Sequence, residues 1–171
     1  QMEAKHVNAG VLRIGYREFG PADGWSCVML HGFPYDVEAY TKVAPVLAES
    51  GARVIVPYMR GYGPTKFLSD DTPRSGEQAA FGADLLALLD ALNIKHAVLG
   101  GYDWGGRAAC VVAALWPERV NTLVTGSSLA KTKAPGTPTP LPSRSREVTA
   151  SLRSSCMGIL LKMTRLLCCS T

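Results

Sequence analysis

The stretch VLGGYDWGGRAAC, residues 98–110, joins an apolar run to a run of helix-forming residues through a glycine-rich turn. This pattern is typical of a buried strand that turns sharply into a helix. One acidic residue, Asp103, lies at the tip of the turn, followed by Trp104. The small residues around the tip push its side chain outward, clear of the backbone. We therefore predict that Asp103 is presented beside a helix N-terminus, where the helix dipole favours negative charge.

The sequence on both sides of this turn alternates between short apolar runs and amphipathic runs. Periodicity and turn residues predict strands at 4–8, 12–20, 27–34, within 52–63, at 95–101 and at 120–126. They predict helices at 37–50, at 72–94 and within 105–120, the last of them stopped at Pro117. This alternation predicts an α/β fold with a mostly parallel sheet and helices on both faces. Reactive groups in such sheets lie beyond the carboxyl ends of strands, where His31, Arg60 and Asp103 all fall.

Composition divides the chain into two parts. The 171 residues are 47% hydrophobic and 19% charged, as in a globular domain. Residues 1–125 carry 11 Lys/Arg and 13 Asp/Glu, a net charge of −2, whereas residues 126–171 carry 7 Lys/Arg and one acid, a net charge of +6. We therefore expect a folded domain over 1–125. Residues 126–171 are predicted to be a low-complexity basic tail, disordered except for a short helix candidate at 156–169.

Several function classes have no support in the sequence. The five cysteines lack metal-ligand spacing, and no nucleotide-binding glycine motif occurs, so we expect neither a metal nor a cofactor. The basic charge lies in the tail and does not indicate a nucleic-acid partner. No run of 18 apolar residues and no signal-peptide pattern occurs, and the short basic tail helix is no firm membrane signal. The cysteine usage favours a cytoplasmic location.

Three motifs and their order resemble a known superfamily. The motifs are HGFP at 31–34, RGYG at 60–63 and GYDWGG at 101–106, placed after successive predicted strands. In these features the chain resembles the α/β-hydrolase superfamily, in the branch that uses an aspartate nucleophile: epoxide hydrolases and the related dehalogenases. The resemblance covers about residues 1–125. HGFP together with DWGG is more similar to epoxide hydrolases than to haloalkane dehalogenases.

The resemblance implies roles for individual residues. Asp103 would attack an sp³ carbon of a small apolar epoxide or organohalide and form an enzyme ester. The backbone N–H groups of Phe33 and Trp104 would form the oxyanion hole. The other residues of the first motif, His31, Gly32 and Pro34, would structure its loop. His31 would not act as the catalytic base. We interpret Arg60 and Tyr62 as structuring their own loop rather than contacting substrate.

The resemblance also implies an acid and a histidine after the nucleophile, and the sequence departs from this pattern. After Asp103 it contains no Asp and no His, and its only acids are Glu118 and Glu147. We therefore expect an incomplete α/β-hydrolase fold joined to an unrelated tail, as a frame shift or a gene-model error would produce. The chain would be inactive or limited to a single turnover.

Alternative functions remain open at this stage. The chain could be a non-catalytic pseudoenzyme or interaction fragment whose tail binds a partner. A dehalogenase-like activity is a lesser alternative, because no motif separates halide displacement firmly from epoxide opening. An esterase is disfavoured, because no Ser, Thr or Cys occupies the tip of the turn at position 103.

Overall fold

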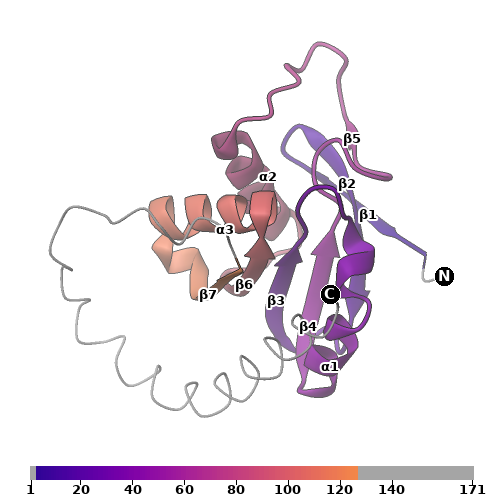
Figure 1. The fold of residues 1–171 in the computed structure, drawn as a ribbon, viewed down its shortest axis with the longest axis vertical. Coiled ribbons are helices and arrows are strands. Elements are labelled where there is room, and N and C mark those ends of the chain that lie inside the picture. The colour runs from indigo at the N-terminus through magenta and orange to yellow at the C-terminus, as the bar shows by residue number, and fades with distance from the viewer. Residues whose placement is uncertain (1–2, 127–171) are drawn as a thin grey trace, which may run out of the picture. The chain divides into compact units, whose positions relative to one another are not determined.

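The computed structural model describes residues 3–126, which form a mixed β-sheet flanked by helices (Figure 1). The strands are β1 Lys5–Ala9, β2 Leu12–Phe19, β3 Trp25–Leu30, β4 Ala52–Pro57, β5 Lys66–Phe67, β6 Ala97–Tyr102 and β7 Val120–Gly126. The helices are α1 Val43–Glu49, α2 Gln78–Ala91 and α3 Asp103–Leu115, with short 3₁₀ helices η1 Val37–Tyr40 and η2 Pro117–Arg119. The predicted α/β class is therefore confirmed.

The sheet has a parallel centre and an antiparallel edge. Its strand order is β1-β2-β4-β3-β6-β7, and the short β5 pairs with β2. The strands β4, β3, β6 and β7 run parallel, whereas β2 is antiparallel to β1, β4 and β5. Because β3 and β6 are parallel neighbours, with Leu30 opposite Gly101, their carboxyl ends meet at one edge of the sheet.

Helices cover both faces of the sheet, as the alternation predicted. Successive side chains of a strand point to opposite faces. In β3, Val28 and Leu30 belong to the main core cluster with leucines of α2 and alanines of α3, whereas the buried Cys27 and Met29 lie outside that cluster. Figure 1 shows α2 and α3 on one side of the sheet and α1 on the other. The central strands are therefore covered on both faces, which explains their continuous apolar runs.

The helix predicted at 37–50 is wrong in one respect, because it is broken into η1 and α1. Asp36 caps η1, with its Oδ1 accepting a hydrogen bond from the Glu38 N–H at 2.9 Å. Pro45 then lies in the first turn of α1. A proline there has no N–H to donate and clashes with the preceding turn, so a helix starts near it but does not run through it.

The other two helices also begin or end differently from the prediction. The predicted helix at 72–94 begins only at Gln78, after a segment that contains Pro73 and Gly76, and it ends before Asn93, which has φ +55°. The predicted helix at 105–120 begins two residues earlier, at Asp103, whereas its predicted stop at Pro117 is confirmed, because α3 ends at Leu115 and η2 begins at Pro117. The two-residue strand β5 was not predicted, because its pairing with β2 is a long-range contact.

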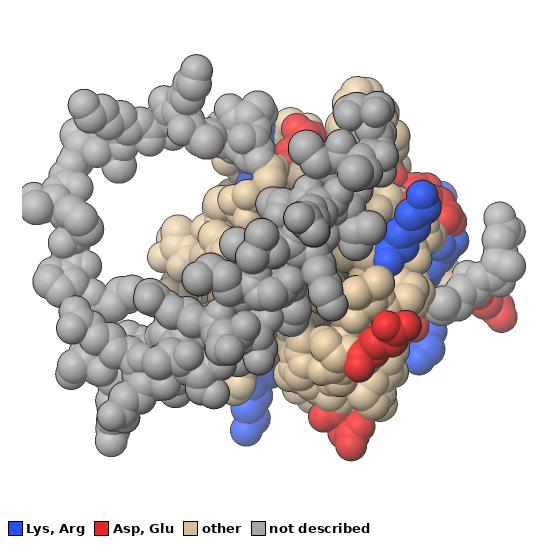
Figure 2. Space-filling view, turned by 60° about the horizontal axis from the view of Figure 1, so that its bottom comes forward, with Lys and Arg blue, Asp and Glu red and all other residues tan. Residues whose placement is uncertain are grey.

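Some predictions concern features that residues 3–126 do not contain. The basic tail and its helix candidate at 156–169 lie outside the described residues. Within the described part of the chain, no helix is both long and apolar enough to cross a membrane. On the face seen in Figure 2, the coloured acidic and basic side chains lie near one another, and they form no large patch of one sign.

A buried hydrogen bond fixes the end of β3 against η1. The Tyr40 hydroxyl donates to the Leu30 carbonyl at 2.8 Å, and the Tyr40 side chain is buried. This carbonyl belongs to the last residue of β3, immediately before the loop that carries the first motif. The bond therefore gives the buried Tyr40 hydroxyl an acceptor and joins η1 to the end of β3.

We expect Tyr40→Phe to lower the free energy of unfolding by about 1–2 kcal/mol, because it removes a buried hydrogen bond between η1 and β3. Urea unfolding followed by circular dichroism measures this. Tyr35→Phe is the matched control, since the Tyr35 side chain is 63% exposed, and it should leave the midpoint unchanged. Equal midpoints for wild type and Tyr40→Phe would contradict the role of this bond.

Candidate active site

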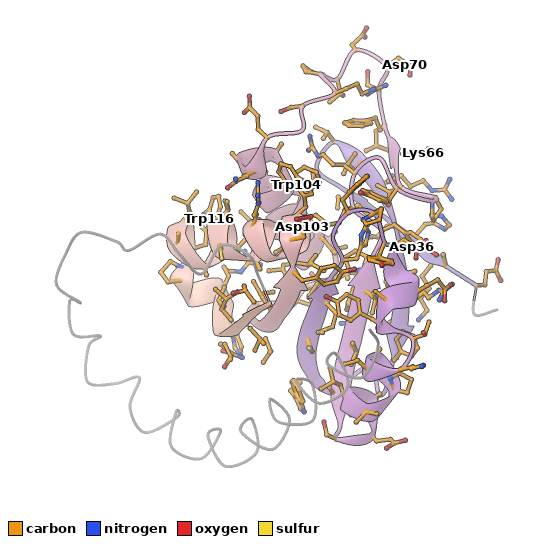
Figure 3. The ribbon with its side chains drawn as sticks, in the orientation of Figure 1. Asp36, Lys66, Asp70, Asp103, Trp104 and Trp116 are labelled. Atoms are coloured by element: carbon orange, nitrogen blue, oxygen red, sulfur yellow. The ribbon has the colours of Figure 1, made fainter. Side chains whose placement is uncertain are left out.

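The site centres on the turn between β6 and α3. Strand β6 ends at Tyr102, and α3 begins at Asp103, whose φ is +49°. Few residues other than glycine adopt this left-handed conformation, and aspartate is among those that tolerate it best. Figure 3 shows Asp103 at the start of α3, next to Trp104. The predicted presentation of Asp103 beside a helix N-terminus is therefore confirmed.

Two glycines allow the first motif to pass directly over this turn. A Cβ atom on Gly105 would lie 2.2 Å from the Leu30 carbonyl oxygen and 2.5 Å from that of His31. A Cβ atom on Gly32 would lie 2.5 Å from the Asp103 Cβ. Any larger residue at either position would require the backbone to move. Because both residues are glycines, the start of α3 can lie directly against the end of β3.

This close approach brings a backbone donor to the carboxylate. The Phe33 N–H donates to Asp103 Oδ2 at 3.3 Å, across 70 positions of sequence. The Trp104 N–H lies in the first turn of α3, where helix N–H groups have no intrahelical acceptor. The N-cap side chain, Tyr102, makes no capping hydrogen bond to that turn. The carboxylate therefore lies beside a helix N-terminus and accepts a hydrogen bond from the first motif.

His31 is buried, and its ring hydrogen-bonds to backbone groups that follow β3 and β4. Its Nε2 accepts a hydrogen bond from the Met59 N–H at 3.2 Å, and its Nδ1 lies 3.3 Å from the Gly32 carbonyl oxygen. Because a backbone N–H can only donate, Nε2 is unprotonated, and Nδ1 carries the proton that is donated to Gly32. Burial lowers the pKa of His31 below its ordinary value. Both ring nitrogens are thus occupied by backbone groups.

The other histidines lie away from the turn. His6 is exposed on β1, and His96 is exposed just before β6, at the opposite end of that strand from Asp103. Among residues 3–126, no histidine side chain hydrogen-bonds Asp103. No group of three His, Cys, Asp or Glu side chains in the described part of the chain could hold a metal ion.

Side chains from the second motif and from α2 pack around the turn in ways that the sequence did not reveal. The Trp104 ring stacks on Phe81 with a centroid separation of 5.5 Å and an interplanar angle of 25°. Arg60 forms a largely buried ion pair with Asp84, Nε to Oδ2 at 2.6 Å. Phe81 and Asp84 are three residues apart on α2, a spacing that places both on one helix face. This spacing indicated that Phe81 and Asp84 share one face of α2, but it did not identify Trp104 and Arg60 as the residues that they contact.

Tyr62, from the RGYG motif, packs against the buried histidine. Its ring meets the His31 ring edge-on, with centroids 4.7 Å apart and planes at 74°. Burial raises the pKa of Tyr62, and the charge of Asp103 raises it further. The second motif therefore supports the first motif directly, in keeping with its interpretation as a loop-structuring element.

Comparison with protein-family models places most of the chain in one family. Residues 28–146 match the family model described as the alpha/beta hydrolase fold. The chain is 36% identical over 113 residues to an epoxide hydrolase of Caballeronia sordidicola, a match that covers 66% of this chain and 32% of the relative. It is 30% identical over 124 residues to a haloalkane dehalogenase of Psychrobacter cryohalolentis, covering 71% of this chain and 39% of the relative. The matched region thus spans about a third of the curated relatives' length.

Solved structures show the same similarity. A proposed epoxide hydrolase from Klebsiella pneumoniae superposes with a TM-score of 0.71 at 49% identity, covering 82% of this chain and 47% of that chain. Epoxide hydrolase A from Mycobacterium thermoresistibile superposes with a TM-score of 0.67 at 26% identity, covering 86% of this chain and 44% of that chain.

Gly105→Ala tests the close contact at the turn. We expect it to lower the free energy of unfolding by more than about 3 kcal/mol, because the added carbon would lie 2.2 Å and 2.5 Å from two backbone carbonyl oxygens, a clash that could be relieved only by moving backbone. Urea unfolding measures the change. Gly76→Ala is the matched control, since nothing lies within 4 Å of its added carbon, and it should be neutral. A neutral Gly105→Ala would contradict the described contact.

The burial of His31 predicts a pH dependence of stability. The pKa of His31 is lowered from its ordinary value of 6.5 by burial, so below about pH 6.5 the unfolded chain binds a proton that the folded chain excludes. The free energy of unfolding should therefore fall with falling pH, by up to about 1.4 kcal/mol per pH unit. Urea midpoints between pH 7 and pH 5.5 measure this. His96→Gln should retain the slope and His31→Gln should lose it; equal slopes in the two variants would contradict the assignment.

Proposed function

Because the chain belongs to the α/β-hydrolase fold family, we propose that it carries the nucleophile half of an epoxide hydrolase-like site, with Asp103 as the nucleophile. The observation that carries this proposal is the position of the Asp103 carboxylate. It lies at a sharp strand-to-helix turn with a left-handed φ, and it accepts a hydrogen bond from Phe33. Similarity to epoxide hydrolases across two thirds of the chain supports the choice of substrate class.

An aspartate at the turn favours attack on an sp³ carbon. A carboxylate is a competent nucleophile toward the strained sp³ carbon of an epoxide. In the proposed step, Oδ2 stays on the Phe33 N–H while Oδ1 of Asp103 forms a new bond to the epoxide carbon. The carbon–oxygen bond of the ring breaks, and its electron pair remains on the former epoxide oxygen, which takes a proton from water and leaves a hydroxide ion in the solvent. The product is a hydroxyalkyl ester of Asp103.

Hydrolysis of that ester requires a second set of groups. Water attacking the ester carbonyl produces an oxyanion, for which the N–H groups of Phe33 and Trp104 are the proposed donors. The attacking water also needs a base. His31 is an unsuitable base because both of its ring nitrogens are hydrogen-bonded to backbone groups. We therefore infer that this chain forms the ester and hydrolyses it slowly, so that the adduct accumulates.

Halide displacement is a second candidate for the same carboxylate. The similarity to a haloalkane dehalogenase supports it, and the proposed first step differs only in the leaving group. Attack by Oδ1 on an alkyl halide would form the same kind of ester and release the halide ion with the bonding electron pair. Adduct formation with an epoxide but not with an alkyl bromide would favour an epoxide hydrolase-like function over a dehalogenase-like one.

Intact-mass spectrometry of the 171-residue chain tests the proposal. After incubation with a terminal aryl epoxide such as styrene oxide, we expect a single adduct of one epoxide mass per chain. Peptide mapping should place this adduct on Asp103. Its formation should outpace release of diol, because the His31 ring, held by backbone groups, is an unsuitable base for hydrolysing the ester.

Asp103→Asn is the control for this experiment. Asparagine tolerates the left-handed conformation, so the variant should keep the fold, and it retains every cysteine that could react with an epoxide. The adduct should disappear in this variant. An unmodified wild-type chain would contradict the proposal and favour a non-catalytic interaction role, and rapid multiple turnover would contradict the inferred accumulation of the ester.

A further inference from the structure

A continuous stack of guanidinium groups and aromatic rings leads from the loop after β5 to the turn that carries Asp103. Its members, called here the arginine–aromatic stack, are Arg74, Phe67, Arg60, Phe81, Trp104 and Arg107. The guanidinium carbon of Arg74 lies 4.1 Å from the Phe67 ring centroid, and that of Arg60 lies 5.7 Å from the Phe67 centroid. Arg60 also lies 5.7 Å from the Phe81 centroid, and Arg107 lies 4.6 Å from that of Trp104. These distances are within the range of cation–π attraction.

Arg60 is the central member of the stack and its most constrained one. Its side chain is 8% exposed, and it meets Asp84 with two bonds, Nε to Oδ2 at 2.6 Å and Nη2 to Oδ1 at 2.7 Å. It also donates to the carbonyl oxygens of Ser75 at 2.7 Å and Ala80 at 3.3 Å. A forked guanidinium with these partners has little freedom to move. Arg60 therefore ties the RGYG loop to α2 and to the segment before it.

The Phe81 ring connects Arg60 with the turn that carries Asp103. Phe81 lies between Arg60 and Trp104, and its ring stacks on the indole ring at 5.5 Å. Trp104 follows Asp103 directly, so the placement of its ring limits where its backbone N–H can lie. Arg107 covers the indole ring as well, and its Nε is buried without a hydrogen-bond partner among the described residues. The indole is thus held by contacts to α2 and α3.

We propose that Arg60 is a positioning residue for Asp103, holding Phe81 against the Trp104 ring and so fixing the first turn of α3 from which the carboxylate projects. This inference rests on the proposed function, because the alignment of the carboxylate matters only if Asp103 reacts. Arg60 itself does not touch the substrate in this account. Its effect on the reaction passes through Phe81 and the indole ring.

The rate of adduct formation on Asp103 is the first test. Arg60→Gln removes the ion pair and the cation, and we expect it to slow adduct formation by about tenfold or more, since small displacements of reacting groups cost rates of this order. Arg60→Lys keeps the charge but loses the fork, so its rate should fall between those of wild type and Arg60→Gln. Phe81→Leu keeps the ion pair and breaks the stack, and it should also be slow.

A spectroscopic test follows Trp104 without requiring any reaction. Replacing Trp25 and Trp116 with Phe leaves Trp104 as the only tryptophan. In this background, Arg60→Gln and Phe81→Leu should shift the emission to longer wavelength and increase quenching by acrylamide, because the indole loses its stacking partner. Should Arg60→Gln fail to fold by circular dichroism, Phe81→Leu and Arg60→Lys still decide the question.

Arg53→Gln is the matched control. Arg53, in β4, is likewise a largely buried arginine, and its Nε pairs with Glu18 Oε1 at 2.6 Å. The structure records no contact between Arg53 and the members of the arginine–aromatic stack among the described residues. It should leave the adduct rate and the Trp104 emission unchanged. Arg60 variants with wild-type rate, or with a slow rate but unchanged emission, would overturn the inference. A wild-type chain that forms no adduct would overturn the proposed function, and the emission test would then decide the placement of Trp104 alone.

Discussion

The rest of the site depends on the contact between the first turn of α3 and the end of β3. Gly105 has no Cβ, so the backbone of α3 can lie against the carbonyl oxygens of Leu30 and His31. This contact brings the first motif over the turn and places the Phe33 N–H on the Asp103 carboxylate. The left-handed φ of Asp103 is the cost of that arrangement, and such backbone strain is kept where surrounding structure holds it. The geometry of the carboxylate is therefore a consequence of backbone packing.

Hydrogen bonds from the His31 and Tyr40 side chains to backbone groups hold the strand ends around this contact. The His31 ring joins the end of β3 to Met59, shortly after β4, and the Tyr40 hydroxyl donates to the Leu30 carbonyl. Buried polar groups that lack partners cost folding free energy, so these bonds favour one arrangement of the strand ends. The same bonds occupy the histidine nearest to Asp103. A residue that serves the architecture in this way is not free to act as a base, which is why ester formation and ester hydrolysis separate in the proposed mechanism.

Local patterns predicted the strands and the turn well, and long-range contacts account for what they missed. The apolar runs and the glycines around Asp103 predicted the α/β class and its helix N-terminus, and the matches to the α/β-hydrolase fold confirm the resemblance drawn from the motifs. The break near Pro45 follows from a local signal, because proline disfavours a continuous helix through that position. The pairing of Arg60 with Asp84 was not readable, because it joins residues 24 positions apart whose proximity depends on how α2 packs on the sheet. The roles of Phe33 and Trp104 as oxyanion donors remain predictions.

The chemical nature of the adduct on Asp103 tests the central claim most directly. Hydroxylamine cleaves esters but leaves the thioethers and amines that an epoxide forms with cysteine, lysine or histidine. After reaction with styrene oxide, treatment of the chain with hydroxylamine should remove the adduct mass and convert Asp103 into a hydroxamate. An adduct that survives the treatment, or that maps to the exposed Cys110, would contradict the claim that the carboxylate at this turn is the nucleophile.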